Sequence, residues 1–236
     1  MSDGKKRDVN GQAVEKILVE AESLSKQDLK NLYLGYAKIT KNYGSAIKEM
    51  TTKLQILDDD FELLHEHNPI HHMESRIKSP ESIVEKLTRR GYTLDLNNIH
   101  NQLFDIAGIR VICHYIEDIY TIVELLKMQS DITIVKETDY IKNPKPNGYR
   151  SFHLVVKVRV YFVDGVEEIP VEVQIRTMAM DFWASLEHKI RYKSEGVIPQ
   201  FIANELKDCA EATTLSDLQM QRIHSFLDDL ENINKE

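Results

Sequence analysis

The first third of the chain is dominated by apolar residues that recur at spacings of three and four. The pattern runs from about Lys26 to His67 and predicts one long helix with a single apolar face. The Asn-Pro pair at 68–69 ends or bends this helix, because a residue before proline avoids the helical conformation. Residues 1–24 read as a polar N-terminal extension with a short helix around Val14–Ala21.

A second, shorter helix is predicted after this break. Ser79 can cap its N-terminus, Pro80 suits its first position, and Glu81 complements the helix dipole. We expect it to end near Gly91, since glycine readily adopts the left-handed conformation that closes helices.

From there the pattern alternates between strands and helices. The expected elements are a strand at Ile106–His114, a helix at Asp118–Met128, a strand at Ile132–Glu137, a loop at Asn143–Tyr149, strands at Phe152–Val163 and Glu168–Arg176 joined by a tight turn at Asp164-Gly165, a helix at Met178–Lys193, and one or two helices within Pro199–Leu230. The sequence therefore predicts an α+β fold with a central mixed β-sheet flanked by helices.

Composition narrows the class of protein. The 236 residues suit one domain, and 42% apolar with 29% charged residues is ordinary for a soluble globular protein. We expect no membrane span and no signal peptide. Cys113 and Cys209 lack metal or redox spacing, so a reducing cytoplasm fits best. The net charge of −8 argues against non-specific nucleic-acid binding, which relies on excess Lys and Arg.

A local group of cations surrounds the second helix. Ser82, Lys86 and Arg89 are spaced i, i+4 and i+7, so they share one helical face. Arg76 and Lys78 precede the helix and can fold over its N-terminal end, where free N–H groups favour phosphate. A solvated basic face would show the same spacing, so the pattern alone leaves both interpretations open.

Two carboxylates occupy strand positions that suit a magnesium ion. Asp105 leads into a buried strand, and Glu172 shares one strand face with Gln174 and Arg176. Hard cations such as Mg²⁺ prefer oxygen ligands, so the pair could complete a two-carboxylate site. A strand-capping Asp and a solvated sheet face are the alternative interpretations.

Arg110 follows Asp105 on the same strand and could meet a phosphate or lie flat on a base. Positions 105 and 110 should face opposite sides of a regular strand. Both can reach one site only if the strand starts after Asp105 or bulges, and Gly108 is the expected bulge.

The loop that follows combines cations with aromatic rings. Tyr149 offers a π-face for a base, Lys145 offers charge for phosphates, and His153 follows on the next strand. An ordinary surface loop could look the same.

The helix at Met178–Lys193 carries a polar stripe of Asp181, Ser185 and His188. The carboxylate of Asp181 could accept the N1–H and N2–H groups of guanine and so discriminate it from adenine. Three apolar neighbours are expected in the core: Phe182, Trp183 and Leu186.

Four histidines lie close together in sequence, at 65, 67, 71 and 72. They straddle the predicted end of the long helix, and no cysteine joins them. Structural zinc sites usually have closed tetrahedral ligand spacing, so we do not expect zinc here.

Taken in order, five segments resemble the synthetase domain of the RelA/SpoT family: RIKSPESIVEK, DIAGIR, PKPNGYRSFH, VEVQIRT and AMDFWASLEHK. The resemblance covers roughly residues 68–193. It implies a nucleotidyltransferase-like synthetase fold with a sheet of about five strands and long N- and C-terminal helices. A single domain at 25–236 would comprise N-terminal helices (25–90), a catalytic α/β core (91–193) and C-terminal helices (194–236).

The chain is too short for the hydrolase and regulatory domains of long family members, so it looks like a small alarmone synthetase, most similar to the RelP subfamily. This implies transfer of the β,γ-pyrophosphate of ATP to the 3′-hydroxyl of GTP or GDP, giving AMP and pppGpp or ppGpp. It further implies a cytoplasmic homotetramer that uses Mg²⁺. A non-catalytic guanine-nucleotide sensor, an RNA-binding module and a nucleotidyltransferase that releases pyrophosphate are the alternatives.

The family's roles fall on matching positions of this sequence. For ATP the resemblance implies Arg76 and Arg110 around the adenine, with Lys78, Ser82, Lys86 and Arg89 at the phosphates. For the acceptor it implies Tyr149 on the guanine, with Lys145, His153, Gln174 and Asp181 as further contacts. Asp105 and Glu172 would hold Mg²⁺, and Glu172 would take the proton of the 3′-hydroxyl.

Two departures from the family pattern concern specificity and regulation. Asp181 stands where related small synthetases carry asparagine. His72 and Glu74 stand where product-activated relatives carry an aromatic and a small polar residue, so the resemblance does not imply activation by product.

Overall fold

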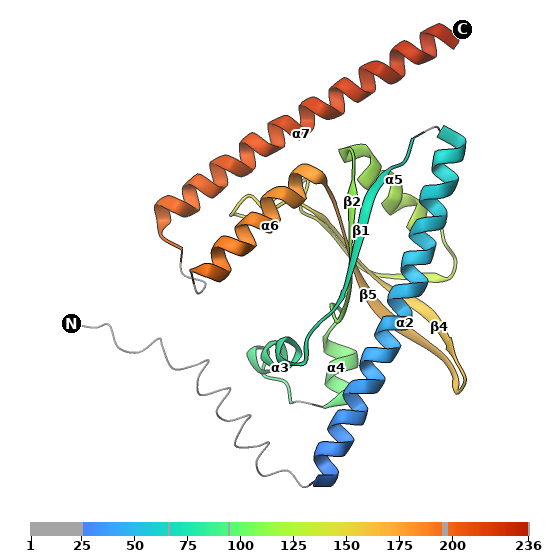
Figure 1. Ribbon diagram of the computed structural model, residues 1–236, viewed down its shortest axis with the longest axis vertical. Helices are drawn as coiled ribbons and strands as arrows, with labels where there is room; N and C mark the ends of the chain where they lie inside the picture. Colours follow the sequence, from blue (N-terminus) through green and yellow to red (C-terminus); the bar gives the residue numbers. More distant parts are fainter. Residues whose placement is uncertain (1–25, 66, 94, 195–197, 236) are drawn as a thin grey trace, which may run out of the picture.

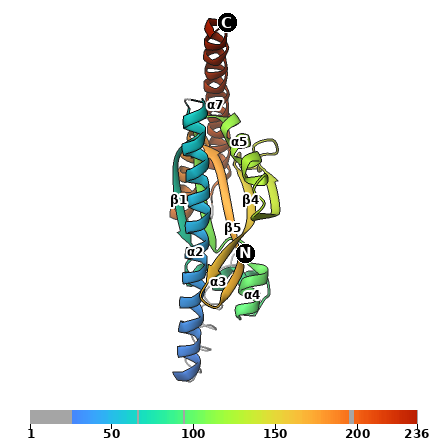
Figure 2. The same cartoon turned by 90° about the vertical axis from the view of Figure 1, so that its right-hand side faces the viewer.

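Two long helices and a five-stranded sheet dominate the molecule (Figure 1). The computed structural model describes residues 26–65, 67–93, 95–194 and 198–235. Helix α2 spans Lys26–His65 and α7 spans Gln200–Lys235, and Figure 2 shows that they extend beyond the sheet at opposite ends. The expected long terminal helices are therefore confirmed, while the short helix predicted around Val14–Ala21 lies outside the described residues.

The sheet is mixed, as predicted. Its strands are β1 (Ile70–Ile77), β2 (Ala107–Cys113), β3 (Ile132–Asp139), β4 (Phe152–Phe162) and β5 (Gly165–Thr177). Their order is β1-β2-β5-β4-β3; β2 and β5 run parallel, and every other neighbouring pair is antiparallel. The shorter helices are α3 (Pro80–Arg89), α4 (Leu96–Gln102), α5 (Ile116–Lys127) and α6 (Met178–Lys193).

One face of the sheet is the main core, and the other face is polar. Helices α2 and α5 pack on the core face, where alternate residues of β5, Val171, Val173 and Ile175, are fully buried. Figure 1 shows α6 on the opposite side of the sheet from α2 and α5. Because side chains alternate along a strand, Glu172 and Gln174 project toward that second face, as the sequence predicts.

Two elements were not expected. Residues 70–77 form the edge strand β1 rather than a connection between helices, and α4 forms a short helix capped by Asp95. The sequence of β1 shows no apolar alternation because most of its side chains are exposed at the sheet edge. The remaining elements lie within a few residues of their predicted bounds, and the break at 68–69 is present.

The backbone around Gly108 corrects one expectation. Strand β2 begins at Ala107, so Asp105 precedes the strand and is free of its alternation. Gly108 pairs in regular register with Arg76 on one side and Glu172 on the other, so the expected bulge is wrong. The first of the two alternatives holds: a late strand start brings Asp105 and Arg110 to the same side.

Helix α6 is less buried than its apolar residues suggested. Trp183 is buried as expected, but Phe182 and Leu186 are 58% and 45% exposed, so their assignment to the core is wrong. Within the described residues, no helix is long and apolar enough to cross a bilayer.

Candidate active site

Strand register places the candidate site on the polar face of the sheet. One row across four strands joins Glu74, Arg110, Gln174 and His153; the neighbouring row joins Arg76, Gly108 and Glu172. Residues that lie up to 64 positions apart in sequence, such as Arg110 and Gln174, thus become direct neighbours. The row geometry explains why polar residues on four strands can act together.

Two adjoining pockets open on this face. The first includes Asp105 and Glu172 in its lining, and the second includes Lys145, Tyr149 and His153. Three residues line both pockets: Arg76, Arg110 and Gln174. The arrangement suits two ligands that meet at a shared boundary.

The first pocket holds a carboxylate that is already surrounded by cations. Oδ2 of Asp105 accepts hydrogen bonds from the Nζ atoms of Lys78, at 2.7 Å, and Lys86, at 2.5 Å. Burial alone would raise the pKa of Asp105, but the two ammonium groups outweigh it and hold the pKa below its usual value. Its second oxygen, Oδ1, is buried and has no hydrogen-bond partner within the described residues.

The second carboxylate, Glu172, is held by two neighbours. Its Oε2 accepts a hydrogen bond from Gln174 Nε2 at 2.9 Å, and its Oε1 lies 3.4 Å from His153 Nδ1. Burial would raise the pKa of Glu172, but the contacts with His153 and Gln174 lower it overall, against a smaller raising effect of Asp105. These contacts therefore favour the carboxylate form of Glu172, which is the form that can accept a proton.

These two carboxylates fit a magnesium ion. Magnesium is usually bound by one or two carboxylates together with substrate phosphates and water, rather than by an all-protein cage. The described part of the chain has no group of three or more His, Cys, Asp or Glu that could hold a metal. The unpartnered Oδ1 of Asp105 is the kind of oxygen that such an ion would satisfy.

The remaining predicted ATP residues divide into two sets. Arg76 and Arg110 line both pockets, and Arg110 Nη1 lies 3.0 Å from Glu74 Oε2. Ser82 lies in the first turn of α3, where its backbone N–H donates to Ser79, and Arg89 is exposed at the end of that helix. Neither Ser82 nor Arg89 lines the two pockets.

The second pocket contains an aromatic platform with cations beside it. Lys145 Nζ lies 4.7 Å from the ring centre of Tyr149, and the guanidinium of Arg176 lies 5.8 Å from it. The hydroxyl of Tyr149 is 2.8 Å from Nε2 of His153. A ring that is fixed at its hydroxyl and flanked by cations is well suited to a phosphorylated nucleoside.

Asp181 lies between two arginines. Its Oδ1 is 3.5 Å from Arg176 Nη1 and 3.6 Å from Arg110 Nε. The structure thus places this carboxylate beside the shared boundary of the pockets, where it compensates cations.

Sequence reasoning noted Arg176 on the Glu172 face but assigned it no role. It is only 3% exposed, and its Nη2 donates to Gln174 Oε1 at 2.9 Å. Arg176 lies four residues after Glu172 on one strand, and this spacing alone indicates that both side chains project from the same face. Its contact with Tyr149 joins residues far apart in sequence and could not be read from spacing.

The comparisons with known proteins agree with this geometry. Residues 75–197 match the family model described as the region found in RelA/SpoT proteins, and the match spans all five motif segments. The chain belongs to the RelA/SpoT family. Among curated relatives, Bacillus subtilis GTP pyrophosphokinase YwaC is 45% identical over 201 residues, which is 85% of this chain and 96% of the relative. Bacillus subtilis GTP pyrophosphokinase YjbM is 38% identical over 77% of this chain and 84% of the relative.

Solved structures of the family share the fold. Small alarmone synthetase 1 from Bacillus subtilis, bound to its product pppGpp, superposes with a TM-score of 0.74 at 36% identity, covering 80% of this chain and 96% of that one. Small alarmone synthetase 2 from the same organism gives 0.73 at 45% identity, covering 80% and 98%. Synthetase 1 has also been solved with AMPCPP, with a TM-score of 0.71 at 33% identity, covering 82% and 98%. The expected synthetase fold is thereby confirmed.

Proposed function

We propose that this chain is a GTP pyrophosphokinase, which transfers the β,γ-pyrophosphate of ATP to the 3′-hydroxyl of GTP or GDP. The products are AMP and pppGpp or ppGpp. The observation that carries the proposal is the pair of adjoining pockets, one with two carboxylates and one with an aromatic platform. Its family membership supports the same chemistry, since relatives are named GTP pyrophosphokinases and one related structure contains pppGpp.

ATP is assigned to the pocket that contains Asp105. Lys78 and Lys86 converge on one oxygen of Asp105, so their ammonium groups are gathered where a polyphosphate can take over as partner. Arg76 and Arg110 have planar guanidinium groups that can lie against adenine. Ser82 and Arg89 are proposed to contact the phosphates from α3.

Asp105 and Glu172 are proposed to hold Mg²⁺ together with the phosphates of ATP. When bound, the ion would neutralise negative charge on the transferred group. Asp105 keeps an ionised carboxylate for this purpose, because Lys78 and Lys86 lower its pKa.

The acceptor is assigned to the pocket that contains Tyr149. The guanine would stack on Tyr149, with Asp181 near its edge, while Lys145 and Gln174 would contact the rest of the nucleotide. His153 links the two halves of the site, because one ring nitrogen faces Tyr149 and the other faces Glu172.

The reaction follows from this placement. The acceptor 3′-oxygen attacks the β-phosphorus of ATP in line, and its proton passes to the carboxylate of Glu172. A bond between the 3′-oxygen and the β-phosphorus forms, while the bond from that phosphorus to the α,β-bridging oxygen breaks and AMP leaves. Such transfers depend on positioning and on neutralising charge, which the surrounding Lys and Arg side chains provide.

A carboxamide in place of Glu172 tests this assignment. Glu172→Gln keeps the shape of the side chain but cannot accept the proton, so release of AMP should fall by about 10²–10⁴-fold. The matched control is Glu168→Gln on the same strand, whose side chain is paired with Arg159 away from both pockets. Wild-type turnover in Glu172→Gln would refute the role of this residue as base.

We also propose a cytoplasmic homotetramer. Helix α7 exposes a series of large apolar side chains toward its C-terminal end, which favours burial against further copies of the chain. They are Leu215, Leu218, Met220, Ile223, Phe226, Leu227 and Leu230. A sedimentation measurement that gives the mass of a single chain would contradict this proposal.

A further inference from the structure

The segment that carries Lys145 and Tyr149 is a tight turn between β3 and β4. Gly148 N donates to Lys145 O at 2.8 Å, Lys145 N donates to Tyr149 O at 3.1 Å, and Tyr149 N donates to Asn147 Oδ1 at 3.2 Å. The ammonium group and the ring proposed to bind the acceptor are thus fixed relative to one another. Because the turn lies outside both strands, its position over the sheet depends on other contacts.

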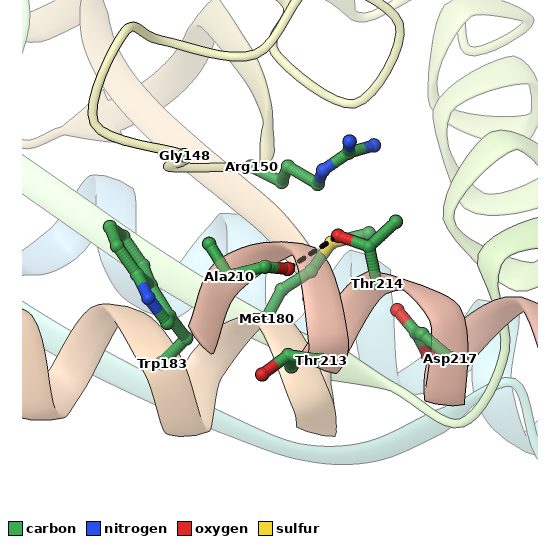
Figure 3. A pocket seen from close by; sticks show the side chains of 8 residues that line it. All are labelled: Gly148, Arg150, Met180, Trp183, Ala210, Thr213, Thr214 and Asp217. Carbon is green, nitrogen blue, oxygen red and sulfur yellow. Dashed lines mark hydrogen bonds between the residues drawn. The ribbon is translucent and has the colours of Figure 1, made fainter. Parts of the chain in front are cut away.

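Two helices that follow much later in sequence support this turn. Figure 3 shows Gly148 directly above Ala210 of α7. A Cβ atom at position 148 would lie 2.5 Å from the Cβ of Ala210, which is closer than two non-bonded carbon atoms can approach. From α6, Glu187 Oε1 accepts a hydrogen bond from Asn147 Nδ2 at 3.2 Å.

The ring of Tyr149 also rests on these helices. It packs against a small apolar cluster, separate from the main core, which we call the α6–α7 cluster: Trp183, Ala184 and Ala210. Trp183 joins the two helices, since its Nε1 donates to Leu206 O of α7 at 2.8 Å. The platform for the acceptor base is therefore supported by side chains that lie outside the sheet.

The support is itself anchored to the strand that carries Glu172. Thr177, the last residue of β5, donates its hydroxyl to Asp217 of α7 at 2.6 Å. The carboxylate of Glu187 is held in turn by Arg191, with nitrogen–oxygen distances of 2.9 and 2.6 Å. Turn, helices and β5 thus form one connected unit.

We propose that Ala210 and Glu187 are positioning residues for the acceptor nucleotide. They hold the turn at 145–149 so that a base stacked on Tyr149 presents its 3′-hydroxyl to Glu172. The inference rests on the proposed function for its substrate. Position 148 requires glycine for two separate reasons, a φ of 90° and the absence of space beside Ala210. Position 210 requires a small residue for the second reason alone.

Gly148→Ala tests the proposal through the two substrates separately. The added methyl group should displace the turn and raise the KM for GTP by about tenfold or more, with little change in the KM for ATP. Glu187→Ala, which releases Asn147, should likewise raise the KM for GTP with little change in the KM for ATP. Equal increases in both KM values would indicate general loss of structure and would overturn the proposal.

A second-site change separates steric contact from backbone strain. Ala210→Gly in the Gly148→Ala background removes the facing methyl group, so part of the lost GTP affinity should return while the φ strain remains. The control is Ala212→Gly, an exposed position on the same helix with the same intrinsic cost to helix formation. The contact between positions 148 and 210 would be refuted if Ala210→Gly restored no GTP affinity, or if Ala212→Gly restored as much.

Fluorescence provides a readout that does not depend on turnover. Trp183 is the only tryptophan of the chain, so its emission reports on the α6–α7 cluster alone. Gly148→Ala should shift this emission to longer wavelength, and Ala210→Gly should reverse the shift in that background. An unchanged emission would contradict docking of the turn on the cluster. If the wild-type protein released no AMP, the proposed function would fail, and the emission would still decide whether Ala210 holds the turn.

Discussion

At the scale of single residues, the link between Tyr149, His153 and Glu172 organises the site. His153 is placed with one nitrogen 2.8 Å from the Tyr149 hydroxyl and the other 3.4 Å from the carboxylate of Glu172. His153 thus contacts both Tyr149, on which the guanine is proposed to stack, and Glu172, the proposed proton acceptor. A change at His153 should therefore alter both stacking and proton transfer.

This link predicts a shift in the pH dependence of turnover. Burial tends to raise the pKa of Glu172, and the contact with His153 is the largest effect that lowers it. In wild-type protein the base stays ionised as the pH falls, until the pH reaches its depressed pKa. His153→Ala should raise that pKa, so the acid limb of kcat/KM should move to higher pH.

A second histidine variant shows whether a shift of the acid limb is specific to the contact between His153 and Glu172. His188→Ala changes a histidine on α6 that lines the pocket containing Tyr149. This variant should leave the acid limb of kcat/KM where it is in wild-type protein. An acid limb that does not move in His153→Ala would show that this contact does not control the pKa of Glu172.

At the scale of elements, the attachment of α7 depends on a buried carboxyl group. Burial raises the pKa of Asp217, and the hydrogen bond from Thr177 offsets this only in part. Because the folded-state pKa lies above the unfolded-state pKa, proton binding favours the folded state. Stability should therefore fall as the pH rises from below the unfolded pKa through the folded pKa.

Asp217→Asn tests this directly. The amide oxygen can still accept the Thr177 hydroxyl, but the buried negative charge is gone. We expect a higher urea midpoint than wild type near neutral pH, with a difference that shrinks as the pH falls below the ordinary aspartate pKa. Asp229→Asn, at an exposed position of the same helix, should show no such pH-dependent gain. A lower midpoint for Asp217→Asn at neutral pH would contradict the account.

Elements with a strong periodic pattern could be predicted from sequence, and those without one could not. Helices α2 and α7 have long apolar repeats, and β2, β4 and β5 are rich in Val and Ile. Strand β1 was missed because its edge position leaves most side chains exposed, which removes the alternation that marks a strand. The bulge expected at Gly108 was wrong because a late strand start achieves the same result.

Site residues could be proposed where neighbours in sequence share a face. Glu172 and Gln174 are two apart on one strand, and their common orientation follows from strand geometry. Contacts between distant segments carry no such signal. Gly148 meets Ala210 across sixty-two positions, and Arg176 of β5 meets Tyr149 of the turn between β3 and β4, so both contacts depend on tertiary packing.

At the scale of the whole molecule, the fold separates stability from chemistry. The apolar face of the sheet is buried under α2 and α5, which lie on one side of it (Figure 1). The opposite face carries the charged side chains of both pockets. An acidic protein can thereby hold a concentrated cationic site for polyphosphates. The two pockets share a boundary at Gln174, next to Glu172, which is where atoms must pass from donor to acceptor.

The fate of labelled phosphorus in ATP distinguishes pyrophosphate transfer from other phosphoryl chemistry at this site. Purified protein is incubated with GTP, magnesium and ATP that carries its label in either the α- or the β-position. We expect the β-label to move to a guanosine product bearing a 3′-diphosphate, while the α-label remains in AMP. A β-label released as free pyrophosphate, or retained in unreacted ATP, would contradict pyrophosphate transfer by this site.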